Sequence, residues 1–196
     1  MPYGGNDWLE ITKEEIIEPS LPICDPHHHY WDLRTQRIPY GRYLLHELLD
    51  DINDHNVTST VFIEARAMYS ADLEESSKPV GEVEFVEGLS AASSSGIYGK
   101  SRASASIIGH ANLNLGDDVE PILESLLEAS PRRFKGIRHI VAWDTDKVCS
   151  RVADGSRCLT DAVGVGTVIS CTRTVFKTCT LVACAADGVV SPAVAT

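Results

Sequence analysis

Three consecutive histidines lie near the start of the chain, in the segment DPHHHYWD at 25–32, directly after a short apolar run at 21–25. In an extended chain, residues i and i+2 project to one side, so His27 and His29 can point together while His28 points away. Two imidazoles beside a carboxylate are the start of a Zn²⁺ or Mn²⁺ site, whose metal would acidify a water and polarise a carbonyl. An exposed loop or a hydrogen-bonded strand end is the alternative.

Further ionisable residues follow each of the later apolar runs. Glu64, His110 and His139 are candidates for a third metal ligand or for catalysis. The alternatives are that Glu64 is a rim carboxylate paired with Arg66, and that His110 is a buried histidine bonded to the backbone. Arg138 could bind a substrate carboxylate as a bidentate fork, or form a structural ion pair.

The elements that must position these residues alternate along the chain. β-Branched and apolar runs predict strands, and amphipathic stretches predict helices. The order is β-α-β-α-β-α-β, which indicates parallel strands with right-handed helical crossovers. The fold class is therefore α/β, either an open doubly wound sheet or part of a (β/α)8 barrel. None of the expected strands is followed by a glycine-rich phosphate loop, which argues against a nucleotide-binding version of either fold. The expected strands are 21–25, 58–67, 104–113 and 133–143, and the expected helices are 43–55, 78–93 and 117–129.

In both architectures the carboxyl ends of the strands meet at one rim, where active sites of this class lie. All four expected strands end in ionisable residues, so the sequence predicts a polar site on that rim.

Composition narrows the class of partner. The 196 residues include 17 Lys and Arg against 28 Asp and Glu, a net charge of −11. This balance argues against nucleic acid or an anionic membrane and leaves a small-molecule substrate as the expected partner. No apolar run reaches the roughly 18 residues of a membrane span. The first residues do not resemble a signal peptide, and six Cys without one favour a reducing, cytoplasmic location.

The composition changes abruptly near residue 144. Residues 145–196 hold five Lys and Arg against four Asp, and contain no Glu, His, Tyr or Trp. We therefore expect an N-terminal arm at 1–20, an α/β unit at 21–144 and a tail of different origin at 145–196. The tail segments GTVIS, RTVFKT and TLVACA are β-branched, so they could add strands to open edges of the sheet, and such edges also favour self-association.

The segment from about Ile23 to Asp144 resembles the N-terminal half of the amidohydrolase superfamily. The closest branch is the amidohydrolase-related group with 2-pyrone-4,6-dicarboxylate lactonases and L-fuconolactonases. The stretches that carry the resemblance are ICDPHHHYWD, YLLHELLDDI, TVFIEARAMYS, PVGEVEFVEGL, IIGHANLNLGDDVEPILE and RFKGIRHIVAWD.

The resemblance implies a TIM-like barrel that hydrolyses a lactone, ester or amide of a small organic or sugar acid. In it, His27 and His29 match the first-strand histidine pair that binds a divalent metal, zinc being the expected one, and Arg138 matches the arginine of the fourth strand. Some lactonases of this branch need no tightly bound metal. The family continues with four more strands, so the chain is expected to form an incomplete barrel, about (βα)3β, followed by an unrelated tail such as a frameshift or splicing change would produce. A genuine alternative C-terminal module, or a non-catalytic fragment that keeps a partial histidine site, is the competing interpretation.

Overall fold

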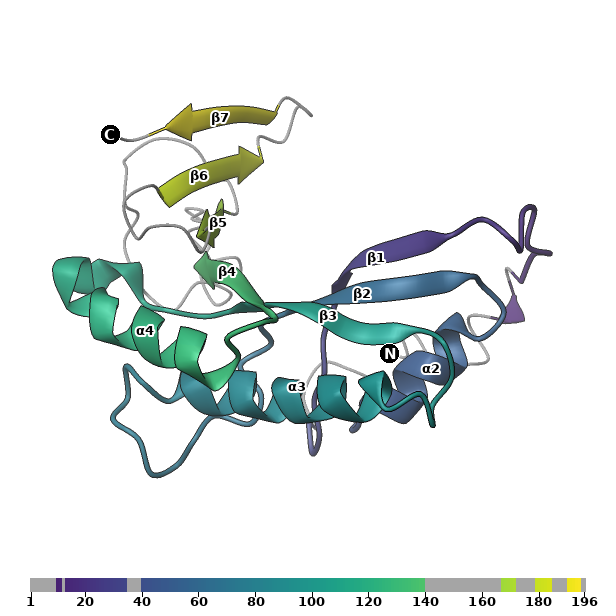
Figure 1. The fold of residues 1–196 in the computed structure, drawn as a ribbon, viewed down its shortest axis with the longest axis horizontal. Helices are drawn as coiled ribbons and strands as arrows, with labels where there is room; N and C mark the ends of the chain where they lie inside the picture. Colours follow the sequence, from purple (N-terminus) through teal and green to yellow (C-terminus); the bar gives the residue numbers. More distant parts are fainter. Residues whose placement is uncertain are drawn as a thin grey trace.

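Four parallel strands form the centre of the molecule. The computed structural model describes residues 10–11, 13–34 and 40–139, together with the backbone of 167–171, 179–184 and 190–194. The strands pair in the order of the chain, without the reversal of order that defines a doubly wound sheet (Figure 1). They are β1 (Ile23–His28), β2 (Val57–Ile63), β3 (Arg102–Gly109) and β4 (Phe134–His139).

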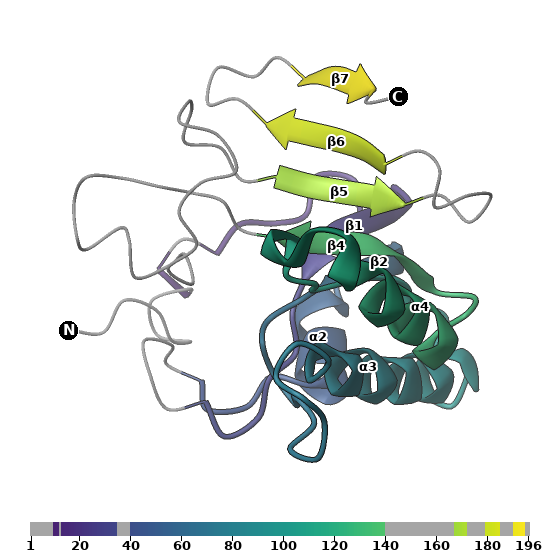
Figure 2. The ribbon, with the colours of Figure 1, turned by 90° about the vertical axis from the view of Figure 1, so that its left-hand side faces the viewer.

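Three α-helices connect these strands, and all three lie along one face of the sheet (Figures 1 and 2). This placement follows from the right-handed crossover of each β-α-β unit, which puts successive helices on the same side when the strand order does not reverse. The helices are α2 (Leu45–Ile52), α3 (Pro79–Ser94) and α4 (Glu120–Ala129), and a 3₁₀ segment, η1 (Leu113–Val119), precedes α4.

The core lies between the helices and this face of the sheet. Phe62 and Ile107 of the central strands are fully buried there, against Val83 and Val86 of α3 and Leu126 of α4. These residues are the apolar members of the predicted strand and helix patterns, so the burial of one helix stripe and one sheet face stabilises the fold.

Some expected boundaries were wrong. β1 runs on to His28, past the expected end at residue 25, because His28 pairs in register with Phe62. The helix expected from residue 117, with an Asp N-cap, begins at Glu120; its N-cap is Val119 and no side chain caps it. Gly116 (φ 61°) adopts a left-handed conformation that interrupts the preceding helical turns.

Three further strands extend the sheet beyond β4. β5 (Thr167–Cys171) pairs with β4 in the antiparallel sense, and β6 (Cys179–Cys184) and β7 (Val190–Val194) follow, also antiparallel (Figure 2). Two of the expected tail strands are thus present, β7 was not expected, and the segment at 173–178 lies outside the described residues, as does the continuation of β4 at 140–143. The β4 edge, expected to be open, is therefore paired in the described part of the sheet.

The molecule is an α/β protein in which four parallel strands alternate with helices. Among the described residues, none of the helices has the length and apolar character that a bilayer crossing requires.

Candidate active site

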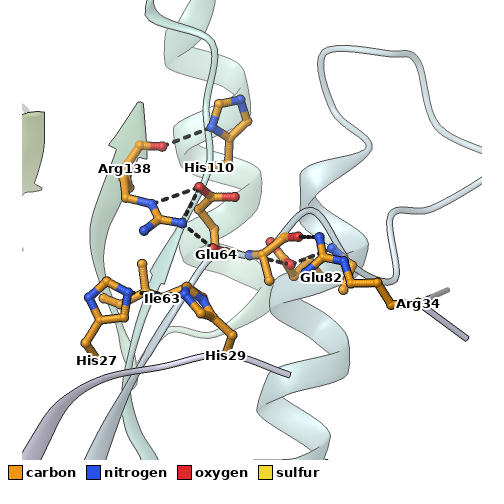
Figure 3. Close-up of polar contacts among 10 residues, drawn as sticks. His27, His29, Arg34, Ile63, Glu64, Glu82, His110 and Arg138 are labelled. Carbon is orange, nitrogen blue, oxygen red and sulfur yellow. Dashed lines mark hydrogen bonds and ion pairs between the residues drawn. The ribbon is translucent and has the colours of Figure 1, made fainter. Parts of the chain in front are cut away.

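The first and third histidines of the triplet converge at the end of β1. The Nε2 atoms of His27 and His29 lie 3.1 Å apart, and the two rings meet edge to face (Figure 3). The carboxylate of Asp25 accepts a hydrogen bond of 3.0 Å from the His27 backbone N–H, which holds the chain as it leaves the strand. The structure therefore confirms the predicted alternation, in which the side chains of His27 and His29 point to the same side of the chain.

His29 is oriented by the neighbouring strand. Its Nδ1 atom lies 2.7 Å from the carbonyl oxygen of Ile63, so Nδ1 carries the proton and donates, and Nε2 presents a lone pair toward His27. Burial lowers the pKa of His29 below its ordinary value, and the positive charge of Arg138 acts in the same direction. A neutral imidazole with a defined lone pair is the state that a metal ligand or a general base requires.

His28 points to the opposite side and belongs to the core. It is 6% exposed, its ring meets Tyr30 and Phe62 edge to face, and its Nε2 lies 3.2 Å from the hydroxyl of Ser104. Burial lowers the pKa of His28 to about 4. It therefore packs as a neutral residue and takes no part in the rim.

A buried Glu64 and a half-buried Arg138 form an ion pair between the ends of β2 and β4. Arg138 Nε donates to Glu64 Oε1 at 2.9 Å, and Arg138 Nη2 contacts both that oxygen (2.8 Å) and the Glu64 carbonyl (2.6 Å). The Glu64 side chain is 2% exposed, and its Oε2 has no hydrogen-bond partner within the described residues. Of the alternatives open from the sequence, the structural ion pair holds for Arg138, and its partner is Glu64.

The remaining two histidines stack on each other at the ends of β3 and β4. The rings of His110 and His139 are 5.6 Å apart and nearly parallel. His110 Nδ1 donates to the Arg138 carbonyl at 2.9 Å, and burial lowers the pKa of His110. The Nδ1 of His139 lies 3.1 Å from the Ala111 carbonyl, and its buried Nε2 has no partner in the described part of the chain. Of the two interpretations of His110 open from the sequence, the structure therefore agrees with a buried histidine that is hydrogen-bonded to the backbone.

All four strand ends therefore contribute to one polar rim, but not to one metal site. Figure 3 shows the Glu64–Arg138 pair between the His27–His29 pair and His110. No group of three or more metal-ligating side chains occurs within the described residues. A catalytic zinc needs three protein ligands, so the converging pair supplies two and the expected third is not brought to it.

Sequence reasoning missed two residues that hold the rim together. Glu82 of α3 is fully buried and accepts hydrogen bonds from the backbone N–H groups of Ala65 and Ala67. Arg34, after β1, donates to the Ala65 carbonyl at 2.7 Å. A signal existed for Glu82, because helical spacing places it beside Val86 on the buried face of its helix.

No protein-family model, curated protein or solved structure matches this chain. Any family assignment therefore depends on the residues themselves.

Proposed function

We propose that the chain is a hydrolase of the amidohydrolase type that acts on a lactone, ester or amide of a small organic or sugar acid. Its parallel strands would be the first four of a TIM-like (β/α)8 barrel. Two features support this architecture: the strands pair in chain order, and the helices all lie on one face, as they do in successive units of such a barrel.

The observation that carries the proposal is the His27–His29 pair. A neutral His29, fixed by its bond to Ile63, presents its Nε2 lone pair at the carboxyl ends of the strands. In the proposed reaction a water takes the place of His27 beside this atom, which accepts a proton from the water as the water oxygen bonds to the substrate carbonyl carbon. The bond from that carbon to the leaving oxygen or nitrogen then breaks, and the proton passes from His29 to the leaving group.

Arg138 would orient the substrate. In the described residues its hydrogen bonds use Nε and Nη2, both toward Glu64, so Nη1 is available to a substrate carboxylate or to the developing oxyanion. The ion pair with Glu64 holds the guanidinium in one direction, which lowers the entropic cost of binding the substrate in a reactive orientation.

A divalent metal, with zinc as the expected ion, fits this site only in part. The separation of 3.1 Å between the two Nε2 atoms is close to the roughly 3.3 Å expected for two imidazoles on one tetrahedral zinc. The bond from His29 Nδ1 to a carbonyl is also the type of outer contact that orients metal-bound histidines. Because the described residues lack the third ligand, the chemistry proposed here uses only side chains.

The test is hydrolysis of a lactone that carries a free carboxylate, with purified wild-type chain and the variants His27→Ala and His29→Ala. We expect His29→Ala to lower kcat/KM by about 100-fold or more, the usual contribution of a general base. His55→Ala is the matched control, because this histidine is exposed and far along the chain from the pair. Unchanged activity in His29→Ala would refute the assignment.

A second function is favoured by the missing third ligand: the chain is a non-catalytic α/β fragment that keeps a partial histidine site. Lactone hydrolysis measured with and without added zinc separates the two. Wild-type protein that shows no hydrolysis above the buffer rate, with or without added zinc, would support the fragment.

A further inference from the structure

Two cysteines lie directly opposite each other in the part of the sheet that continues beyond β4. Figure 2 shows β5 and β6 side by side, and the two strands are antiparallel. Cys171 is the last residue of β5, Cys179 is the first residue of β6, and the two are Cα partners in this pairing. Directly opposed residues of an antiparallel pair share one face of the sheet. The backbone register therefore brings two thiol-bearing residues to the same place.

The spacing of paired strands meets the geometric requirement of a disulfide bond. Directly opposed residues of an antiparallel pair have Cα atoms about 4.5 to 5.5 Å apart, depending on whether they exchange hydrogen bonds. A disulfide needs a Cα separation of about 4.4 to 6.8 Å. Both kinds of pair fall within this range, so Cys171 and Cys179 can be joined without a change in the register of the two strands.

The register opposes no other cysteines at the described positions. Cys184 is also on β6, but five steps of about 3.3 Å place it roughly 17 Å along the strand from Cys179, and on the opposite face. Its register partner on β7 is Val190. Cys24 lies on β1, at the other end of the strand order. Within the described strands, the pairing of thiols is thus specific to positions 171 and 179.

We propose that Cys171 and Cys179 are a thiol modification site, which forms a reversible disulfide when a small-molecule disulfide such as oxidised glutathione is the oxidant. One protein thiolate attacks a sulfur of the oxidant and displaces one glutathione thiolate, which leaves a mixed disulfide. The second protein thiolate attacks the protein sulfur of that mixed disulfide and releases the second glutathione. The two cysteines lose two electrons, the oxidant gains them, and the two thiol protons end on the two glutathione molecules.

The disulfide stabilises the strand that covers β4. β5 pairs with β4 opposite Arg138 and His139, so it lies beside two residues of the rim. A bond between Cys171 and Cys179 restricts the separated conformations of β5 and β6, and this restriction favours the paired form. In a reducing compartment the pair stays as two thiols, and it closes when the oxidant accumulates.

The first experiment maps disulfides in the purified full chain. The chain is reduced, freed of reductant and incubated under native conditions with oxidised glutathione. The remaining thiols are then alkylated, and the chain is digested with trypsin for mass spectrometry. Because trypsin cuts after Arg173 and Lys177, a bond between Cys171 and Cys179 joins two peptides that separate on reduction. We expect this product in the monomer, with two fewer alkylated thiols than in the reduced chain.

A double variant assigns the bond to its two cysteines. Cys158 shares a tryptic peptide with Cys171, and Cys184 shares one with Cys179. In Cys158→Ser/Cys184→Ser the joined peptides can contain only Cys171 and Cys179, and we expect them to form as in wild type. Absence of the joined peptides from this variant would overturn the proposal.

Competition for Cys179 tests the role of the strands. Loop-closure entropy changes slowly with length, so a chain without β6 should join Cys179 to Cys184 about as readily as to Cys171. In the folded Cys158→Ser variant we expect about tenfold more of the bond to Cys171, because the strand keeps Cys184 beyond disulfide range. In concentrated urea the preference should disappear. Equal amounts of the two products in the folded chain would contradict the register.

Hydrogen exchange of the oxidised and reduced chains measures the effect on the sheet. We expect the amides of β5 and β6 to exchange about tenfold more slowly in the oxidised chain, since the bond restricts their separation. Cys171→Ser, treated with the same oxidant, is the control and should exchange as the reduced wild type does. Equal exchange in both forms would overturn the stabilisation of β5. None of these measurements involves hydrolysis, so their outcome is independent of the proposed function.

Discussion

The buried His28 should make the chain sensitive to acid, and His28→Gln is the change that shows it. Burial lowers the pKa of His28 to about 4, against about 6.5 in an unfolded chain. Because the folded pKa lies below the unfolded one, the unfolded chain binds more protons between these values. The stability that the neutral residue contributes is therefore complete above pH 6.5 and is lost as pH falls toward 4.

The magnitude follows from the difference between the two pKa values. At about 1.4 kcal/mol per pH unit, it corresponds to about 3 kcal/mol of unfolding free energy. No discount for solvent screening is needed, because His28 is only 6% exposed. Glutamine preserves a polar group that can reach the Ser104 hydroxyl, 3.2 Å from the histidine Nε2, but it has no proton to gain.

Urea unfolding followed by circular dichroism, at intervals from pH 7.5 to pH 4, measures this difference. At pH 7.5 wild type should be the more stable protein, because His28 also contacts the rings of Tyr30 and Phe62. Its advantage over His28→Gln should shrink by about 3 kcal/mol by pH 4. His55→Gln, at an exposed position, is the control and should follow wild type throughout. An advantage that stays constant to within about 1 kcal/mol over this range would refute the reasoning, since one pH unit of pKa difference is already worth 1.36 kcal/mol.

Three other changes test separate parts of the structure. Gly81→Ala should destabilise the chain by about 1–3 kcal/mol in urea unfolding, because a Cβ would lie 2.7 Å from Ser70 N and 2.9 Å from Met68 O. The matched change Gly88→Ala, on the same helix with nothing within 4 Å, should stabilise it by about 0.5–1 kcal/mol; equal effects at both positions would contradict the packing described here. Arg138→Leu should cost about 3–5 kcal/mol, since it leaves the buried charge of Glu64 alone; Glu64→Leu should cost less, because Arg138 is only half-buried, and the double variant should cost less than the sum of the two. Because the pKa of His29 is lowered, kcat/KM for lactone hydrolysis should stay level as pH falls from 8 to 6.5 and decline only at more acidic pH; half-maximal activity above pH 7 would assign the base to another group.

The parts of this structure that follow a local period were predictable from the sequence. Alternation along an extended chain is enough to separate His28 from its two neighbours, and the structure places them accordingly. The order of strands and helices was likewise readable, because each apolar run is bounded by polar or turn residues. Element ends were less accurate, since pairing between strands decides where β1 ends and a left-handed Gly116 delays α4.

The role of Glu82 depends on topology and so could not be derived from its own segment. In the sequence it is one of several glutamates of the expected helix, most of them outside the core. Its burial is explained only by the turn after β2, which presents two N–H groups to the start of α3. The role of Glu82 as a hydrogen-bond acceptor is set by residues distant from it in the sequence. Helical spacing alone could have identified it only as a polar residue on an apolar helix face.

The position of a residue at the end of a strand does not determine its contact partners, as the three candidate third ligands show. The strand-end pattern placed Glu64, His110 and His139 correctly on one rim, but it did not determine which partner each would meet there. In the structure the chain itself supplies those partners: Arg138 for Glu64, the Arg138 carbonyl for His110 and the Ala111 carbonyl for His139. Two atoms of these three side chains, Glu64 Oε2 and His139 Nε2, are buried without a hydrogen-bond partner in the described residues. Of the two, only Glu64 Oε2 belongs to a carboxylate. A metal bound by the histidine pair would therefore have to draw Glu64 away from Arg138, which requires a rearrangement of the rim, or take its third ligand from outside the described part of the chain.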